Sequence, residues 1–288
     1  MVCLAAAAAG LIAALSGGSA ARRPRAARPA ARSSRHSRLA GPNPTRSKGG
    51  AAGGYPETAE VRRLIAAGRP IYCAPDRGDE VALTFDDGPG PYTRLMLDKL
   101  RKHHAQATFF IVGRNISLAP ALLVRERRAG AVGDHTYTHP RLTALDASEQ
   151  KAQLARTLDA VARAGGGPVF LFRPPYGAHD ATTDRIARSR GLLEILWDVD
   201  SRDSLGASYA QIEHNVIAGV RPGAIVLMHE NHGQTVRAML SIFAALARRH
   251  LRPVSVPQLL ADDPPGAAQL RTPGGGCGVA AGGSLSGG

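Results

Sequence analysis

The amino-acid sequence predicts an α/β fold, a distorted and incomplete (β/α)7–8 barrel with mostly parallel strands. Strand-like runs alternate with helical patterns from residue 80 to about residue 260, and such alternation is typical of a parallel sheet. About seven such units are too many for a small open sheet and suit a barrel. With 288 residues, of which 44% are hydrophobic, the chain can bury one large core or two small ones.

The strand candidates are short apolar runs bounded by turn or helix signals. They cover residues 80–86, 107–112, 131–133, 169–172, 192–198, 224–228 and 251–254. The helical windows cover roughly 93–104, 119–129, 147–164, 180–190, 208–219 and 234–249. The last window is the clearest, because apolar residues recur there at helical spacing: Val236, Met239, Leu240, Phe243 and Leu246.

The N-terminal region has a composition unlike that of the rest of the chain. Residues 1–20 are apolar and end in small residues, which is typical of a secretory signal peptide, although the usual positive residues at its start are missing. An uncleaved membrane anchor is the alternative. Residues 21–54 predict a disordered basic linker, because residues 1–54 carry nine of the 36 Lys and Arg and no acid.

The basic linker suggests an anionic partner. It has no aromatic side chain to stack on bases, which disfavours nucleic acid and leaves an anionic cell wall as the preferred partner. We therefore expect the protein to be secreted or associated with the cell envelope. A monomer is the default expectation, since no pattern in the sequence indicates an oligomer.

Two cysteines lie outside the signal region. Cys73 lies in the lead-in 55–79 and Cys277 in the Gly-rich tail 263–288, which we expect to be mobile. In an exported protein this even pair suggests a disulfide, and two free thiols are the alternative. The catalytic domain is expected between these segments, at residues 80–262.

Polar residues gather where the predicted strands end. The segments are Asp86 and Asp87 after the first strand, "DHTYTHP" at 134–140, "RPPYG" at 173–177, "DVDSRD" at 198–203 and "HENH" at 229–232. The carboxyl ends of barrel strands are where active sites form, so the joint placement predicts one catalytic site.

Metal binding follows from this placement. His135 and His139 are four residues apart, a spacing that brings two imidazoles to one ion, and a carboxylate from the first strand end completes an Asp-His-His set. Three protein ligands with open positions are typical of a catalytic metal site. If one of Asp86 and Asp87 binds the ion, the other is free to act as a base, which explains two adjacent like charges.

The motifs TFDDG, H-T-x-x-H, R-P-P-Y-G, D-x-x-D and L-x-H, in this order, resemble the polysaccharide deacetylases (NodB-homology domain, carbohydrate esterase family 4). The resemblance covers about residues 80–260. It implies a metal site of Asp87, His135 and His139, which usually holds Zn²⁺ and sometimes Co²⁺ or another divalent ion.

The resemblance also implies a role for each remaining motif residue. Asp86 is implied as the general base, with Arg173 orienting it, and the backbone N–H of Tyr176 as an oxyanion donor. His229 is implied as the general acid, with Asp203 tuning it, and Leu227 as part of the pocket for the acetyl methyl group. An imidazole suits the acid role, because it titrates near neutral pH.

One position departs from the family pattern. Family members often carry Trp after the fourth-motif Asp, where this chain has Ser204, so the shape of the substrate groove is open. We interpret Asp134 as a turn or cap residue. Asp198 and Asp200 are left as either substrate contacts or structural residues. His179, His214 and His232 are interpreted as structural or solvated.

The sequence therefore predicts an exported metal-dependent deacetylase that releases acetate from an N-acetylated polysaccharide, preferentially peptidoglycan. N-deacetylation of chitin or chitooligosaccharides and O-deacetylation of xylan use the same chemistry and remain alternatives. Two rivals belong to other classes. One is a catalytically silent glycan-binding protein, and the other is a phosphoesterase that uses the basic tail for nucleic acid.

Overall fold

The computed structural model describes residues 58–277, and the predicted signal peptide and basic linker lie outside them. Eight strands form one sheet in which every pairing is parallel. Seven follow the order β5-β4-β3-β2-β1-β7-β6, and β8 pairs with the start of β1. The strands are β1 (Glu80–Gly88), β2 (Ala107–Ile111), β3 (Gly130–Asp134), β4 (Leu171–Phe172), β5 (Leu193–Glu194), β6 (Val199–Asp200), β7 (Ile225–His229) and β8 (Arg252–Val254).

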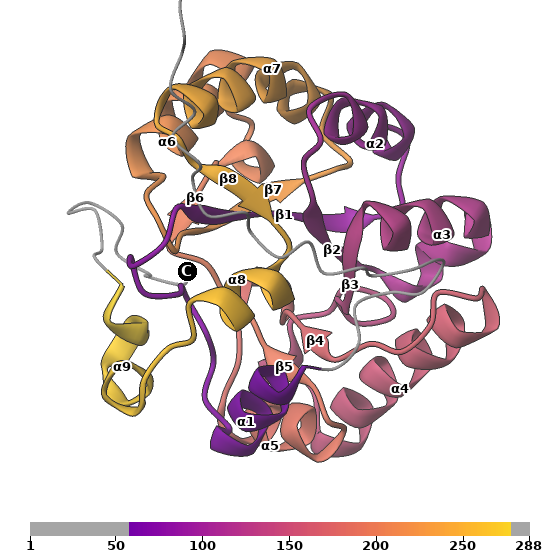
Figure 1. Ribbon diagram of the computed structural model, residues 1–288. Helices are drawn as coiled ribbons and strands as arrows, with labels where there is room; N and C mark the ends of the chain where they lie inside the picture. The colour runs from indigo at the N-terminus through magenta and orange to yellow at the C-terminus, as the bar shows by residue number, and fades with distance from the viewer. Residues whose placement is uncertain (1–57, 278–288) are drawn as a thin grey trace, which may run out of the picture. The chain divides into compact units, whose positions relative to one another are not determined.

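The sheet curls into an incomplete barrel with helices around it, as Figure 1 shows, so the predicted fold class is confirmed. The six expected helices are present as α2 (Thr93–Lys102), α3 (Pro120–Ala129), α4 (Ala147–Arg163), α5 (Ala181–Ser189), α6 (Tyr209–Gly219) and α7 (Gly233–Arg248). Each lies between strands in the chain. The pattern of strand and helix units was therefore a sufficient guide to the architecture.

Two layers of apolar side chains hold the barrel together. The outer layer packs the strands against the surrounding helices, with Phe85 and Phe109 on the sheet and Met239 and Phe243 on α7. Within the barrel lies a second cluster that includes Phe110. Burying such large side chains contributes about 1.5–3 kcal/mol each, which makes these two layers the main source of stability.

Three helices at the two ends of the described chain were not expected. They are α1 (Ala59–Ala67), α8 (Val256–Asp262) and α9 (Ala267–Arg271). Leu64 of α1 and Leu259 of α8 are buried in the inner cluster. The lead-in and the end of the catalytic domain therefore complete the barrel core.

The predicted strand 192–198 is wrong as a single element. Its residues contain the whole of the two-residue strand β5 and the segment leading to β6, which lies at the opposite end of the sheet order. The carbonyls of Ile195 and Leu196 accept hydrogen bonds from the Arg173 guanidinium at 3.0 and 3.1 Å. Because these carbonyls bind a side chain, they are not available to a neighbouring strand.

The lead-in and the C-terminal segment are covalently joined. Cys73 and Cys277 form a disulfide with a Cα–Cα distance of 5.9 Å, so the alternative of two free thiols is wrong. Residues 263–277, expected as the start of the tail, contain α9, and Leu270 packs against the inner cluster. Residues 278–288 lie outside the described part. Within residues 58–277, no helix is both long and apolar enough to cross a membrane.

Candidate active site

A β-bulge at the end of β1 places two adjacent carboxylates at one site. The register with β2 shifts between Asp86 and Gly88, so Asp87 is the extra residue. Asp87 has a φ of 73°, and a bulge re-aims the side chain that it inserts. The strand thus continues through Asp86 and Asp87, where the sequence predicted that it would end, and both carboxylates lie close to His135.

Asp86 is fixed by a fully buried arginine. Arg173, which follows β4, places Nη1 2.8 Å from Asp86 Oδ1 and also donates to Thr84 Oγ1 at 2.8 Å. Its guanidinium lies over the ring of Phe110, with Cζ 4.1 Å from the ring centroid. Burial raises the pKa of Asp86, and the positive charge of Arg173 opposes that shift. The arginine therefore favours the ionised form of a carboxylate that burial alone would neutralise.

The loop after β3 presents the two histidines. Asp134 accepts a hydrogen bond from the Thr136 N–H at 2.7 Å, and Thr136 Oγ1 accepts one from the His139 N–H at 3.1 Å. Thr136 and His139 have positive φ values of 65° and 63°, so the loop folds tightly on itself. Gln153 Oε1 of α4 accepts hydrogen bonds from the two backbone N–H groups that lie between Thr136 and His139. Asp134 is thus the turn residue that the sequence predicted.

The two imidazoles face Asp87. His135 Nδ1 lies 2.7 Å from the Arg173 carbonyl, which leaves Nε2 turned toward the carboxylates, 3.8 Å from Asp87 Oδ1. His139 Nε2 lies 3.4 Å from the same oxygen. Burial lowers the pKa of His135 to about 3, so this imidazole is neutral and its free nitrogen is available as a ligand.

These three residues fit a divalent metal ion. Two imidazole nitrogens and one carboxylate oxygen are the donors that zinc and similar ions take in catalytic sites. The ligand atoms of Asp87, His135 and His139 all lie within 4.8 Å of one another. The carbonyl bound to His135 Nδ1 fixes the ring in the orientation that a metal-ligating histidine needs.

His229 lies beside Asp86 on the neighbouring strand. It is the last residue of β7 and pairs with Asp86 in the sheet register. Its Nδ1 is 2.7 Å from Asp203 Oδ1, and Asp203 Oδ2 accepts the His229 N–H at 2.7 Å and the Thr235 hydroxyl at 2.6 Å. Burial lowers the pKa of His229, but the hydrogen bond and charge of Asp203 outweigh it and raise the pKa to about 9.

Tyr176 and Leu227 border the same region. Tyr176 has a φ of 62°, which turns its backbone sharply, and its exposed ring meets the ring of His139 edge-on at 4.9 Å between centroids. Leu227 is buried in β7 two residues before His229, and side chains two apart share one face of a strand. Ser204, at the position where family members often carry Trp, donates its backbone N–H to Asp203 Oδ1 at 2.8 Å.

The sequence left Asp198 and Asp200 open, and both make local structural contacts. Asp198 accepts the Ile225 N–H at 2.8 Å and pairs with Arg221, and Asp200 accepts the Arg202 N–H. His214 is exposed on α6. The ring centroid of His232 is 5.8 Å from that of His229, so this histidine borders the site.

Some neighbours of the site were missed from the sequence. Asn115 donates a hydrogen bond to the backbone carbonyl of Asp87, and Asn231 donates one to Asp87 Oδ2. Two carboxyls, Glu126 of α3 and Glu230 after β7, are fully buried beside Gly88. Glu230 and Asn231 follow His229 directly, so their position in the sequence could have identified them as neighbours of the site. Glu126 gave none, because a charged residue in a helical window is usually exposed.

The fold and site together define a class of protein. Three features meet at the carboxyl ends of the parallel strands. They are the metal-ligand set, the carboxylate of Asp86 bound by Arg173, and His229 bound by Asp203. This arrangement is suited to metal-dependent hydrolysis.

Comparison with known proteins identifies the family. The sequence model of the polysaccharide deacetylases matches residues 74–195. A peptidoglycan-N-acetylglucosamine deacetylase of Bacillus cereus is 35% identical over 195 residues, covering 65% of this chain and 70% of that protein. A chitooligosaccharide deacetylase of Rhizobium leguminosarum bv. trifolii is 34% identical, covering 68% of this chain and 99% of that protein. The chain belongs to the polysaccharide deacetylase family, carbohydrate esterase family 4, and the deacetylases of this family are metal-dependent hydrolases.

Solved structures agree in fold. The Bc1960 peptidoglycan N-acetylglucosamine deacetylase superposes with a TM-score of 0.64 at 32% identity, covering 66% of this chain and 92% of that one. A family 4 pseudoenzyme from Bacillus anthracis superposes with a TM-score of 0.63 at 30% identity, covering 66% of this chain and 68% of that one. The family therefore includes a member described as a pseudoenzyme on the same fold.

Proposed function

We propose that this protein is an exported, zinc-dependent N-deacetylase that removes acetyl groups from peptidoglycan. One observation carries the proposal: Asp86, held by Arg173 at 2.8 Å, lies beside the Asp87, His135 and His139 set, with His229 opposite in the sheet register. Amide hydrolysis needs a base for water, stabilisation of an oxyanion and an acid for the departing amine. This arrangement has a candidate for each.

The metal-ligand set is assigned to Asp87, His135 and His139. A divalent ion bound there supplies Lewis acidity, which polarises a carbonyl and acidifies water. The proposal favours Zn²⁺, because a mixed set of imidazole and carboxylate donors suits it, and Co²⁺ is an alternative.

Asp86 is assigned as the general base. Its Oδ2 lies 3.6 Å from His135 Nε2, so the carboxylate borders the space between the ligands while Oδ1 stays bound to Arg173. Arg173 is assigned as its positioning residue. A buried carboxylate next to a fixed cation stays ionised and pointed at one place, which is what proton abstraction from water requires.

His229 is assigned as the general acid. With its pKa raised, the imidazole carries a proton at neutral pH and can donate it to the departing nitrogen. Asp203 holds Nδ1, so Nε2 is the atom that transfers the proton. The Tyr176 N–H is assigned as an oxyanion donor and Leu227 as a wall for the acetyl methyl group.

The choice of polymer rests on relatives. The relatives named above act on peptidoglycan and on chitooligosaccharides, and a bifunctional xylanase/xylan deacetylase of Cellvibrio japonicus is 35% identical over 175 residues. Peptidoglycan is preferred because the predicted signal peptide and basic linker would place the enzyme at an anionic wall. Chitooligosaccharides remain the second candidate.

Acetate release tests the proposal. The purified full chain is treated with a chelator and assayed with and without Zn²⁺ on N-acetylated peptidoglycan, chitin oligomers and acetylxylan in parallel. We expect zinc-dependent release that is fastest on peptidoglycan. Acetate release from chitin oligomers alone would make chitin, and not peptidoglycan, the assigned substrate. Stoichiometric zinc without any acetate release would favour a silent glycan-binding protein. Cleavage of phosphodiesters that needs residues 1–54 would overturn the reaction class.

A further inference from the structure

A second cluster of metal-type side chains lies away from the active site. It joins His179, which follows the R-P-P-Y-G loop, Asp184 in the first turn of α5, and Glu194 at the end of β5. One ligand atom from each lies within 4.8 Å of the other two. Three elements thus converge on one point, as they do at the Asp87 set.

One separation between the ligand atoms matches that around a bound ion, because His179 Nδ1 is 3.3 Å from Glu194 Oε1. His179 Nδ1 is 2.8 Å from Asp184 Oδ1, which is a hydrogen-bond length. Ligands about 2.0–2.1 Å from a tetrahedral ion lie about 3.3 Å from one another. At the active site the corresponding distances are 3.4 and 3.8 Å.

Glu194 is the unusual member of the cluster. It is 5% exposed, its strand neighbours Leu193 and Ile195 belong to the inner core, and neither of its carboxylate oxygens has a hydrogen-bond partner within residues 58–277. Leaving a buried carboxylate unsatisfied is costly, so the position needs a compensating group.

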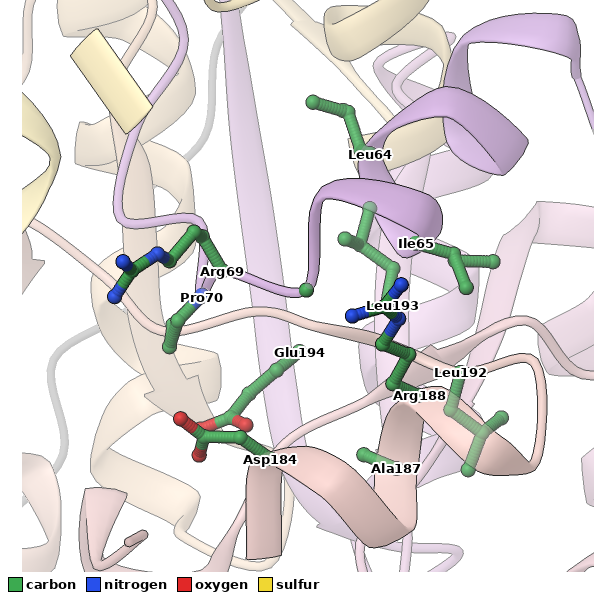
Figure 2. Close-up of a pocket in the computed structure, with 11 residues that line it drawn as sticks. Leu64, Ile65, Arg69, Pro70, Asp184, Ala187, Arg188, Leu192, Leu193 and Glu194 are labelled. Carbon is green, nitrogen blue, oxygen red and sulfur yellow. The ribbon is translucent and has the colours of Figure 1, made fainter. Parts of the chain in front are cut away.

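In the part of the chain that the structure describes, no arginine or lysine supplies that compensation. Arg69 and Arg188 line the adjacent pocket, but within residues 58–277 the ion pairs of Asp184 and Glu194 are with His179 only. Figure 2 shows the carboxylates of Asp184 and Glu194 side by side, facing each other at one end of this pocket. Two carboxylates in this position repel each other unless a proton or a cation lies between them.

We propose that His179, Asp184 and Glu194 form a second binding site, specific for a divalent transition-metal ion such as Zn²⁺. One imidazole and two carboxylates are donors of the type that such ions take, and hard ions such as Mg²⁺ favour all-oxygen sets. The side chains of His179 and Asp184 are 23% and 29% exposed, which gives the ion a path from solvent. Their exposure leaves at least one coordination position for water.

The site would join parts of the fold that surround the active-site loop. His179 lies three residues after Tyr176, α5 begins two residues later, and β5 is the edge strand of the sheet order. An ion there would tie the loop to α5 and β5. Binding to the folded chain alone stabilises it by mass action, so thermal stability reports occupancy without reference to catalysis.

Metal stoichiometry tests the proposal. The full chain and its variants are dialysed against Zn²⁺, and bound zinc is measured by mass spectrometry. We expect two ions per chain in the unaltered protein and one in Glu194→Gln. The double variant His135→Ala/His139→Ala should also bind one, and its combination with Glu194→Gln none. Glu213→Gln on α6 is the matched control and should keep two.

A thermal scan of the His135→Ala/His139→Ala variant adds a readout independent of activity. Zn²⁺ should raise its Tm, and His179→Gln in the same background should remove that rise. His179→Gln also serves if Glu194→Gln does not fold. Zinc stoichiometry of zero in the double variant, with no change in Tm, would overturn the proposal and would show that a protonated His179 compensates the two carboxylates. Equal stoichiometry in Glu194→Gln and the unaltered chain would also overturn it.

Discussion

Arg173 Nη1 lies 2.8 Å from Asp86 Oδ1, and both side chains are buried. The guanidinium is held by two backbone carbonyls, by Thr84 and by stacking on Phe110, so its position is fixed independently of Asp86. The pair is therefore a rigid support for one carboxylate oxygen, which leaves the other turned toward the metal-ligand set.

Asp86→Asn should separate catalysis from metal binding. The amide keeps the shape and accepts the same hydrogen bond, but it cannot take a proton, so we expect the turnover rate to fall by about 10²–10⁴. Zinc stoichiometry should not change, because Asp87, His135 and His139 are intact. Asp87→Ala is the contrasting variant and should lose zinc as well as activity. A wild-type rate in Asp86→Asn would contradict the assignment of the base.

Arg173→Met should destabilise the fold as well as slow the reaction. It leaves Asp86 buried without a cation, and breaking a buried ion pair in this way costs about 3–5 kcal/mol. We expect a urea midpoint well below that of the unaltered protein. The double variant Arg173→Met/Asp86→Leu should recover much of that loss, since it removes both charges. Unchanged stability in the single variant would show that Asp86 is neutral in the folded protein.

Activity should depend on pH through His229. A general acid must carry its proton, so kcat/KM should fall as pH rises through the pKa of His229, which Asp203 raises to about 9. Asp203→Asn removes the charge that raises it. The alkaline limb of the profile should then move toward the ordinary histidine value of about 6.5, as measured by kcat/KM between pH 5 and 10. An alkaline limb that does not move would exclude His229 as the titrating acid.

The sequence was a good guide to the strand ends and a poor guide to local backbone geometry. Asp86 and Asp87 were predicted at one site from their place after an apolar run, but the bulge that re-aims Asp87 depends on pairing with β2. The run 192–198 reads as one strand because its apolar residues are continuous. In the structure the carbonyls of Ile195 and Leu196, in the middle of this run, accept hydrogen bonds from Arg173.

The disulfide should matter for stability and not for chemistry. It joins cysteines 204 residues apart, and a cross-link over such a long loop contributes roughly 2–5 kcal/mol, chiefly by restricting the unfolded chain. Cys73→Ser/Cys277→Ser should therefore unfold at lower urea concentration and keep its kcat at 25 °C. Adding reductant to the unaltered protein should lower its midpoint similarly. If the double variant were fully folded and still lost kcat, the C-terminal segment would take part in the reaction.

The buried carboxyls behind the active site should make the fold less stable as pH rises. Glu126 is fully buried, and both of its oxygens lack a hydrogen-bond partner within residues 58–277. Burial raises its pKa well above the usual value, and the charge of Glu230 adds to that shift. Glu230 itself is raised to about 7, again mainly by burial. The folded chain thus binds protons here that the unfolded chain releases above about pH 4.5.

Glu126→Gln tests this linkage. The free energy of unfolding of the unaltered protein should fall as pH rises from 5 to 8, because a proton favours the folded state at this pair. The variant cannot ionise at position 126, so its Tm should be close to that of the unaltered protein at pH 5 and above it at pH 8. The exposed substitution Glu149→Gln controls for the loss of one charge, and its shift should not grow with pH. If Tm depended on pH in the same way for Glu126→Gln and the unaltered protein, Glu126 would be ionised in the folded state. The proton that favours the folded state would then be bound by Glu230.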